Sequence, residues 1–182
     1  LKEVNFSILD KVIEKIKNLK VIVIGETIVD KYTFVKTSGV SPKANTLSCT
    51  ELEDLLMPGG TLATFRFLSS FIKNIDHISI VNKHSDHLYK KIIKISPNII
   101  KSSNYKKLIK KRIVERGTNT SLNKILTINE YDENNLDIKD ERTILNKLKK
   151  AIPKVDLIIV QDFGHGFFTK KIKDLLKKNS KK

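Results

Sequence analysis

The sequence contains a single cysteine and no long apolar run. The lone Cys49 excludes an internal disulfide and a zinc site built from several cysteines. Its neighbours alternate as in a strand, so we expect a half-buried structural thiol. No apolar run reaches about 18 residues, so we expect no membrane-spanning helix. Residues 1–20 have an amphipathic helical pattern rather than the apolar stretch of a signal peptide, which favours a cytoplasmic protein.

Arginine is also scarce, although the chain is strongly basic. The formal net charge is +15 and the pI is about 9.8, which is typical of proteins that bind nucleic acid or anionic membranes. The arginines, which are preferred for base and bidentate phosphate recognition, are Arg66, Arg112, Arg116 and Arg142. We therefore interpret the charge as a lysine-rich solvated surface, with a nucleic-acid-binding face as the alternative.

Apolar periodicity predicts one α/β domain in which strands alternate with helices in a mostly parallel sheet. Short buried strands are expected at 21–25, 78–81 and 157–160. Helices are expected at 7–18, 61–72, 85–95, 141–151 and after Thr169, with Ser7, Ser85 and Thr169 as caps.

Two further pairs of segments alternate with period two. Residues 32–35 and 47–52 are joined by the turn-forming stretch 36–45, and we interpret them as a small β-excursion that leaves the main sheet. Residues 112–115 and 124–129 predict two more strands joined by a polar loop.

Polar residues at strand ends and helix starts supply the first candidate site. Asp30 lies five residues past Gly25, and its carboxylate can accept two hydroxyl hydrogen bonds, as a sugar or polyol requires. The alternative is an aspartate that only caps or turns the chain. Gly59 and Gly60 precede a helix start, where backbone N–H groups can approach anions or hydroxyls, or where the chain makes an ordinary turn. No Gly-Lys-Ser/Thr follows, so this is not a Walker loop.

A second polar turn, residues 162–166 (Asp-Phe-Gly-His-Gly), directly follows the predicted strand 157–160. Ligands of open α/β sheets bind past the carboxyl ends of strands, so this turn is a candidate site. It does not indicate a protein kinase, because no His-Arg-Asp loop or glycine-rich loop accompanies it. His84 and His87 lack a third nearby ligand, so no metal site is predicted.

Taken in order, five segments resemble the ribokinase-like (phosphofructokinase B-type) carbohydrate kinases. They are KVIVIGETIVDKY, SPKANTL, MPGGTLA, KKRIVER and VDLIIVQDFGHGFFT, and the likeness covers roughly residues 20–176. In particular they resemble the sugar-kinase domain of the bifunctional heptose kinase/nucleotidyltransferase proteins of ADP-heptose synthesis. The resemblance implies a doubly wound α/β core with a small β-lid, at about 31–57, over the sugar.

The resemblance also implies roles for particular residues. Those with an implied substrate-binding role are Asp30, Gly59, Gly60 and Arg112. Those implied to lie near the phosphate path are Asp162 and Gly164. ATP and Mg²⁺ are implied for the complete family fold, with neither site evident in this chain.

The chain departs from the family pattern at important positions. The Gly-Ala-Gly-Asp signature, which supplies the catalytic base and the anion hole, is absent. We therefore expect no catalytic residue in this chain. We expect residues 1–182 to form the N-terminal part of one sugar-kinase domain, with a sheet that is incomplete at the C-terminus. Glu26 stands where Asp is common, and Ala63, Arg66 and Phe67 occupy positions where the family usually has Asn, so no particular sugar is predicted.

Three functions remain open from the sequence. The first is the sugar-binding half of a kinase that phosphorylates a sugar or a heptose-phosphate-like sugar phosphate with ATP. The second is a non-catalytic module that binds a sugar phosphate or a partner, and the third is a basic nucleic-acid-binding protein. The expected partners are the sugar or sugar phosphate and either a C-terminal kinase half or a second copy of the chain through the lid, with no membrane.

Overall fold

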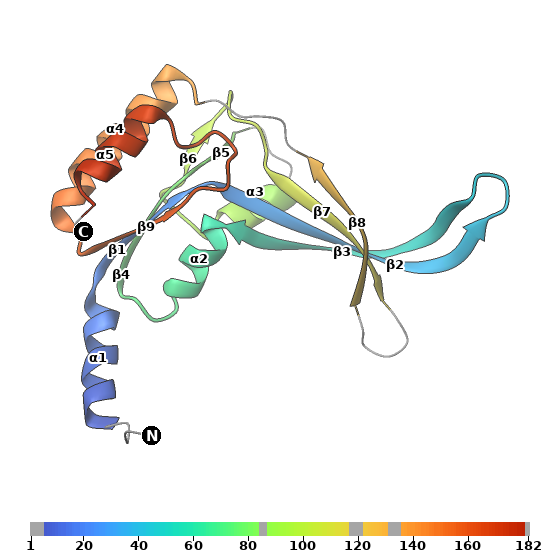
Figure 1. Cartoon of the computed structure of the whole chain (residues 1–182), viewed down its shortest axis with the longest axis horizontal. Coiled ribbons are helices and arrows are strands. Elements are labelled where there is room, and N and C mark those ends of the chain that lie inside the picture. Colours follow the sequence, from blue (N-terminus) through green and yellow to red (C-terminus); the bar gives the residue numbers. More distant parts are fainter. Residues whose placement is uncertain (1–5, 84–86, 117–121, 131–135, 181–182) are drawn as a thin grey trace.

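A computed structural model describes residues 6–83, 87–116, 122–130 and 136–180 of the chain, and it has an α/β core from which a long sheet projects (Figure 1). The centre of the core is β1 (Lys20–Gly25), which pairs in parallel with β4 (Asn74–Ile78) on one side and β9 (Leu157–Gln161) on the other. Residues 21–24 of β1 are at most 1% exposed, as expected for a central strand buried on both faces. The predicted α/β class with parallel strands is confirmed.

Helices cover both faces of this small sheet. Ile22 and Ile24 pack in one apolar cluster with residues of α4 (Ile138–Ala151) and α5 (Lys170–Lys178). On the opposite face, His77 of β4 stacks on Phe65 of α2 (Thr61–Leu68), with ring centroids 5.2 Å apart. Figure 1 shows α4 and α5 together on one side and α2 on the other. The core is therefore doubly wound, as expected from the sequence.

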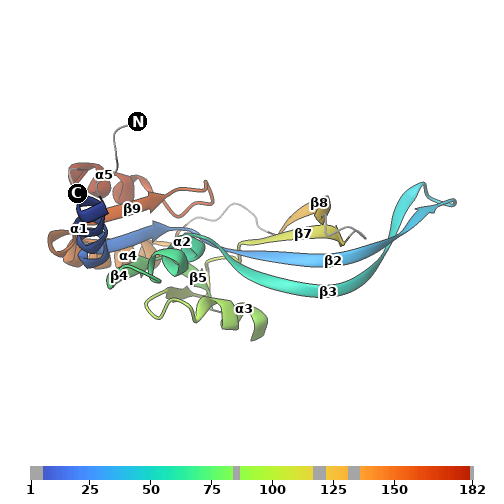
Figure 2. The ribbon, with the colours of Figure 1, turned by 90° about the horizontal axis from the view of Figure 1, so that it is seen from below.

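The projecting sheet has four strands in the order β3-β2-β7-β8. A long antiparallel hairpin is formed by β2 (Thr27–Ser41) and β3 (Thr46–Gly60). The other edge is formed by β7 (Ile109–Arg116), parallel to β2, and β8 (Leu122–Glu130), antiparallel to β7. The hairpin occupies the segment expected to form a lid, and Figure 2 shows how far it extends from the core.

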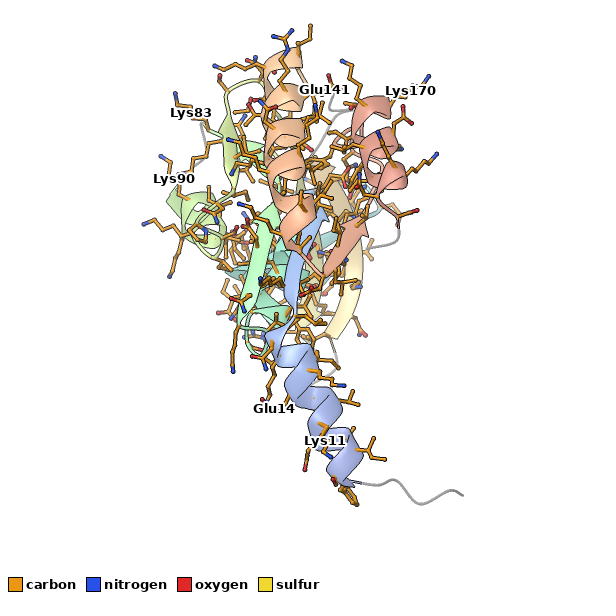
Figure 3. The ribbon with its side chains drawn as sticks, turned by 90° about the vertical axis from the view of Figure 1, so that its left-hand side faces the viewer. Lys11, Glu14, Lys83, Lys90, Glu141 and Lys170 are labelled. Atoms are coloured by element: carbon orange, nitrogen blue, oxygen red, sulfur yellow. The ribbon has the colours of Figure 1, made fainter. Side chains whose placement is uncertain are left out.

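The remaining elements flank these two sheets. A small parallel pair, β5 (Ile80–Asn82) and β6 (Ile100–Ser102), lies with α3 (His87–Ile93) beside the base of the projecting sheet. The one-turn η1 (Ile152–Lys154) ends α4 and contains Pro153. The first helix, α1 (Phe6–Asn18), extends away from the core in Figures 1 and 3 and has no buried residue. None of the described helices has both the length and the apolar character needed to cross a membrane.

Several local expectations are wrong. Cys49 is exposed rather than half-buried, because β3 is an edge strand of a projecting sheet. The stretch 36–41 stays in β2, so the hairpin turn is confined to 42–45. The expected strand 78–81 is divided between β4 and β5, which belong to different sheets.

Helix boundaries differ less from expectation. The helix after Gly60 ends at Leu68 instead of residue 72. Thr169 caps α5, as predicted, and its hydroxyl accepts a hydrogen bond from the Ile172 N–H. Asp137 caps α4, so that helix starts at Ile138 instead of the expected residue 141. Ser7 lies inside α1, and the proposed cap Ser85 lies outside the described residues.

Candidate functional site

Asp30 and Arg112 form an ion pair at the core end of the projecting sheet. Asp30 lies on β2 and Arg112 on the adjacent β7, and the guanidinium donates a hydrogen bond to the carboxylate. The same guanidinium lies over the ring of Tyr32, 5.3 Å from its centroid. The two charged side chains are 18% and 21% exposed, so the pair is held in place and still accessible to a ligand.

Gly59 and Gly60 end β3 directly before α2 instead of forming an ordinary turn. A Cβ on Gly59 would lie 2.6 Å from a carboxylate oxygen of Asp30, so a side chain there would displace that carboxylate. Gly60 has a φ of 56°, and a Cβ on it would lie 2.4 Å from the Glu26 carbonyl oxygen. The two glycines therefore allow β3 to approach Asp30 and the end of β1 closely.

Glu26 is the residue whose importance the sequence did not reveal. It is 0% exposed and follows β1 directly. Its carboxylate accepts hydrogen bonds from the backbone N–H groups of Phe163, His165 and Phe167, at 2.9, 3.2 and 3.4 Å. These contacts satisfy the buried charge, which would otherwise be strongly unfavourable. The one signal in the sequence was an acidic residue placed directly after a buried apolar strand.

The main chain of Glu26 makes a second connection. Its carbonyl oxygen accepts hydrogen bonds from the N–H and the hydroxyl of Thr61, at 3.0 and 2.9 Å. Thr61 is the first residue of α2 and follows Gly60. Glu26 therefore fixes both the helix start after the glycines and the turn 162–166.

Asp162 and Gly164 lie in that turn, at the carboxyl end of β9. The Asp162 carboxylate accepts a hydrogen bond from the Gly164 N–H at 3.0 Å and lies 3.2 Å from the Lys173 ammonium. Gly164 has a φ of 77°, which favours glycine. The structure thus brings Asp30, Gly59 and Arg112 together, whereas Asp162 and Gly164 form a separate group. Glu26 links the two groups, because its carboxylate binds the turn 162–166 and its carbonyl binds the helix start after the glycines.

Two residues at positions where the ribokinase-like family usually has Asn are exposed on α2. These residues are Arg66 and Phe67, and Phe67 is 68% exposed. In the part of the chain that the structure describes, no three His, Cys, Asp or Glu side chains are grouped to hold a metal ion.

His77 of β4 contacts the first turns of α2. Its Nε2 lies 2.9 Å from the Thr61 hydroxyl, and its ring stacks on Phe65. Burial lowers the pKa of His77 to about 4, an effect that the nearby Asp76 carboxylate partly opposes. The imidazole is therefore neutral in the folded protein at neutral pH.

Comparison with known proteins supports a sugar-kinase relationship. No family model matches the chain. The bifunctional protein HldE of Haemophilus influenzae is 25% identical over 155 residues, which cover 82% of this chain and 31% of that protein. HldE of Aliarcobacter butzleri is 24% identical over 161 residues, which cover 86% of this chain and 33% of that protein. The chain thus spans about a third of the length of these curated relatives.

Solved structures agree on the fold. A possible 1-phosphofructokinase from Thermotoga maritima superposes with a TM-score of 0.59 and 16% identity, covering 88% of this chain and 51% of that one. Phosphofructokinase-2 from Escherichia coli, solved with fructose-6-phosphate, gives a TM-score of 0.56 and 11% identity, covering 90% and 52%. The ribokinase-like sugar-kinase fold is therefore present, over about half the length of those chains, and the resemblance to ribokinase-like carbohydrate kinases is confirmed.

The role of Glu26 can be tested by Glu26→Gln. The amide nitrogen of glutamine cannot accept the hydrogen bonds that a carboxylate oxygen accepts, so at least one backbone N–H of the turn loses its partner. We expect a loss of about 1–3 kcal/mol in the free energy of unfolding. Hydrogen exchange at Phe163, His165 and Phe167 should accelerate at least about tenfold. The exposed Glu130→Gln is the control, and unchanged exchange at the three amides in Glu26→Gln would contradict this role.

Burial of His77 makes the stability depend on pH. The unfolded pKa is 6.5 and the folded pKa about 4, so the contribution of neutral His77 is complete above pH 6.5 and is lost as pH falls toward 4. This shift corresponds to about 2–3 kcal/mol between pH 7.5 and pH 4.5. Urea unfolding should show that loss in the wild type and a smaller loss, by about that amount, in His77→Phe. Equal losses in the two proteins would rule out His77 as the cause.

Proposed function

We propose that this chain is the sugar-binding half of an ATP-dependent carbohydrate kinase that acts on a sugar phosphate. The observation that carries the proposal is the partly exposed ion pair of Asp30 and Arg112 beside Gly59. A carboxylate accepts hydrogen bonds from sugar hydroxyls, and a guanidinium binds phosphate through paired N–H donors. In this proposal Asp30 binds the hydroxyls, Arg112 binds the phosphate, and Gly59 and Gly60 line the pocket.

The substrate class is proposed from two kinds of likeness. Phosphofructokinase-2, which shares the fold, was solved in complex with fructose-6-phosphate, so a sugar phosphate suits this architecture. The five sequence segments resemble heptose kinases, and the curated relatives are HldE proteins. We therefore place a heptose phosphate first among the candidate substrates and ADP-heptose synthesis first among the candidate pathways.

Phosphoryl transfer would require groups beyond those of this chain. It depends on positioning and on stabilisation of charge at the transferred group, which ATP, Mg²⁺ and a catalytic base provide in the proposed complete kinase. The described residues offer no cluster of metal ligands, and the Gly-Ala-Gly-Asp signature is absent from the sequence. We assign Asp162 and Gly164 to the path toward the nucleotide and assign no catalytic step to this chain.

A C-terminal kinase half is the proposed partner for this step. β9 is the last strand in the order β4-β1-β9, so one of its edges is unpaired among the described strands. Its Leu157 and Val160 are 37% and 48% exposed, whereas residues 21–24 of the central β1 are at most 1% exposed. A further parallel strand of the kinase would cover this edge and these side chains.

Sugar binding can be tested by calorimetric titration of hexose and heptose phosphates. We expect Asp30→Asn to weaken binding at least about tenfold, because a hydrogen-bond acceptor and the partner of Arg112 are both lost. The control is Asp54→Asn, which removes the same charge from an ion pair with Lys31 in the same sheet and should bind normally. Absence of binding by the wild type, or equal weakening in the two variants, would contradict the proposed pocket.

The same protein should bind the sugar phosphate without phosphorylating it. ADP release from ATP and Mg²⁺, measured with the chain alone, is expected to equal the background rate. Turnover above background that Asp30→Asn abolishes would show that this chain is catalytically complete.

We also propose that the chain forms a homodimer through the projecting sheet. Exposed apolar residues occupy both of its faces. Register places Leu55 and Met57 on the face that carries Asp30 and Arg112, and Leu126 on the other. Such exposure is typical of association surfaces, and a related phosphofructokinase-2 is described as tetrameric.

Sedimentation equilibrium can test this dimer. The wild type should have the mass of a dimer, and either Leu55→Glu or Leu126→Glu should reduce it to that of a monomer, because a charge would be buried in an apolar contact. Ile138→Glu, at a 68% exposed position on α4, is the control and should remain dimeric. A monomeric wild type would refute the dimer.

A further inference from the structure

A pocket of about 360 Å³ lies between α3, the segment that follows it, and β6. This volume is within the range of small-ligand pockets. Half of its lining residues are lysines and none is acidic. The lining residues are Lys83, Lys90, Ile93, Lys94, Ser96, Pro97, Ile99 and Lys101.

The four lysines converge from separate parts of the chain. Lys101 lies on β6, and the backbone N–H of Lys83 donates a hydrogen bond to the Ser102 carbonyl at 2.6 Å, which holds Lys83 beside that strand. Lys90 lies on α3, and the backbone N–H of Lys94 donates to the Lys90 carbonyl at 3.3 Å, which continues the helix. Figure 3 shows Lys83 and Lys90 extending outward on the same side of the molecule. Folding, and not a run of lysines in the sequence, therefore creates this basic rim.

The floor of the pocket is apolar and contains one polar group without a partner. Ile93 and Ile99 are 4% and 7% exposed, whereas all four lysines are exposed. Ser96 is 2% exposed, and its hydroxyl has no hydrogen-bond partner among the described residues. A buried hydroxyl in this state is unfavourable and calls for a further polar partner.

The lysine charges are also uncompensated. Within the described ranges none of the four forms an ion pair, whereas Lys31, Lys171 and Lys173 each pair with a carboxylate. Like charges gathered around one pocket repel each other, and a multivalent anion would relieve that repulsion. Lysine is a compact point charge that suits phosphate oxygens.

We propose that this pocket binds a small phosphorylated metabolite, at a site separate from Asp30 and Arg112. The lysine ammonium groups bind the phosphate oxygens, the Ser96 hydroxyl donates a hydrogen bond, and Ile93 and Ile99 contact the organic part. Those two isoleucines also pack with Val29, the residue before Asp30, so the second site adjoins the strand that carries the first. This inference goes beyond the proposed function and does not depend on it.

Titration calorimetry with inorganic pyrophosphate at constant ionic strength tests the proposal. We expect saturable binding by the wild type and at least about tenfold weaker binding by the double variant Lys94→Ala/Lys101→Ala. The matched control Lys177→Ala/Lys178→Ala removes the same charge from α5 and should change the affinity less than about twofold. Equal weakening in the two double variants would indicate a diffuse surface effect and overturn the proposal, as would a wild type that does not bind.

Two further variants locate the site and identify the source of the phosphate. Ser96→Ala should weaken pyrophosphate binding and leave the fold intact, whereas Arg112→Gln, which removes the guanidinium of the other site, should leave pyrophosphate affinity unchanged. Loss of pyrophosphate binding in Arg112→Gln alone would place the anion at Arg112 instead. A single-stranded oligonucleotide should bind the wild type and the Lys94→Ala/Lys101→Ala variant equally. If that variant lost only oligonucleotide binding, the lysines would belong to a nucleic-acid surface and the proposal would be wrong.

Discussion

The buried carboxylate of Glu26 is the interaction on which the arrangement of the site depends. It holds the turn at the end of β9 through three backbone N–H groups, while its carbonyl holds the start of α2 through Thr61. A charge that is 0% exposed is stable only when its partners are in place. The positions of the glycine-led helix and of the Asp162 turn are therefore coupled, although the two are separated by about a hundred residues of sequence.

The second constraint is steric and lies next to the first. Gly59 leaves room for the Asp30 carboxylate, and that carboxylate in turn pairs with Arg112 on the neighbouring strand. Backbone approach and charge pairing thus act together on the Asp30 carboxylate at the base of the projecting sheet. The result is a pair of opposite charges that the fold holds in place, which would lower the entropic cost of binding a ligand in the proposed pocket.

The sequence predicted features that depend on local pattern and missed those that depend on distant pairing. The buried β1 and the cap at Thr169 follow from apolar runs and side-chain chemistry, and both are present. The length of the hairpin could not be read from residues 36–41, because cross-strand pairing overrides their turn composition. Glu26 was missed as a structural anchor because its partners are backbone groups more than 130 residues away, which leave no residue pattern.

The open edge of β9 also affects how the protein behaves in solution. Among the described strands β9 leaves one edge unpaired, and this edge, with the exposed Leu157 and Val160, offers a template to another extended chain. Repulsion between molecules that carry a net charge of +15 opposes such association. Added salt screens that repulsion, so the excess of lysine should oppose association through this edge most at low ionic strength and least where salt is high.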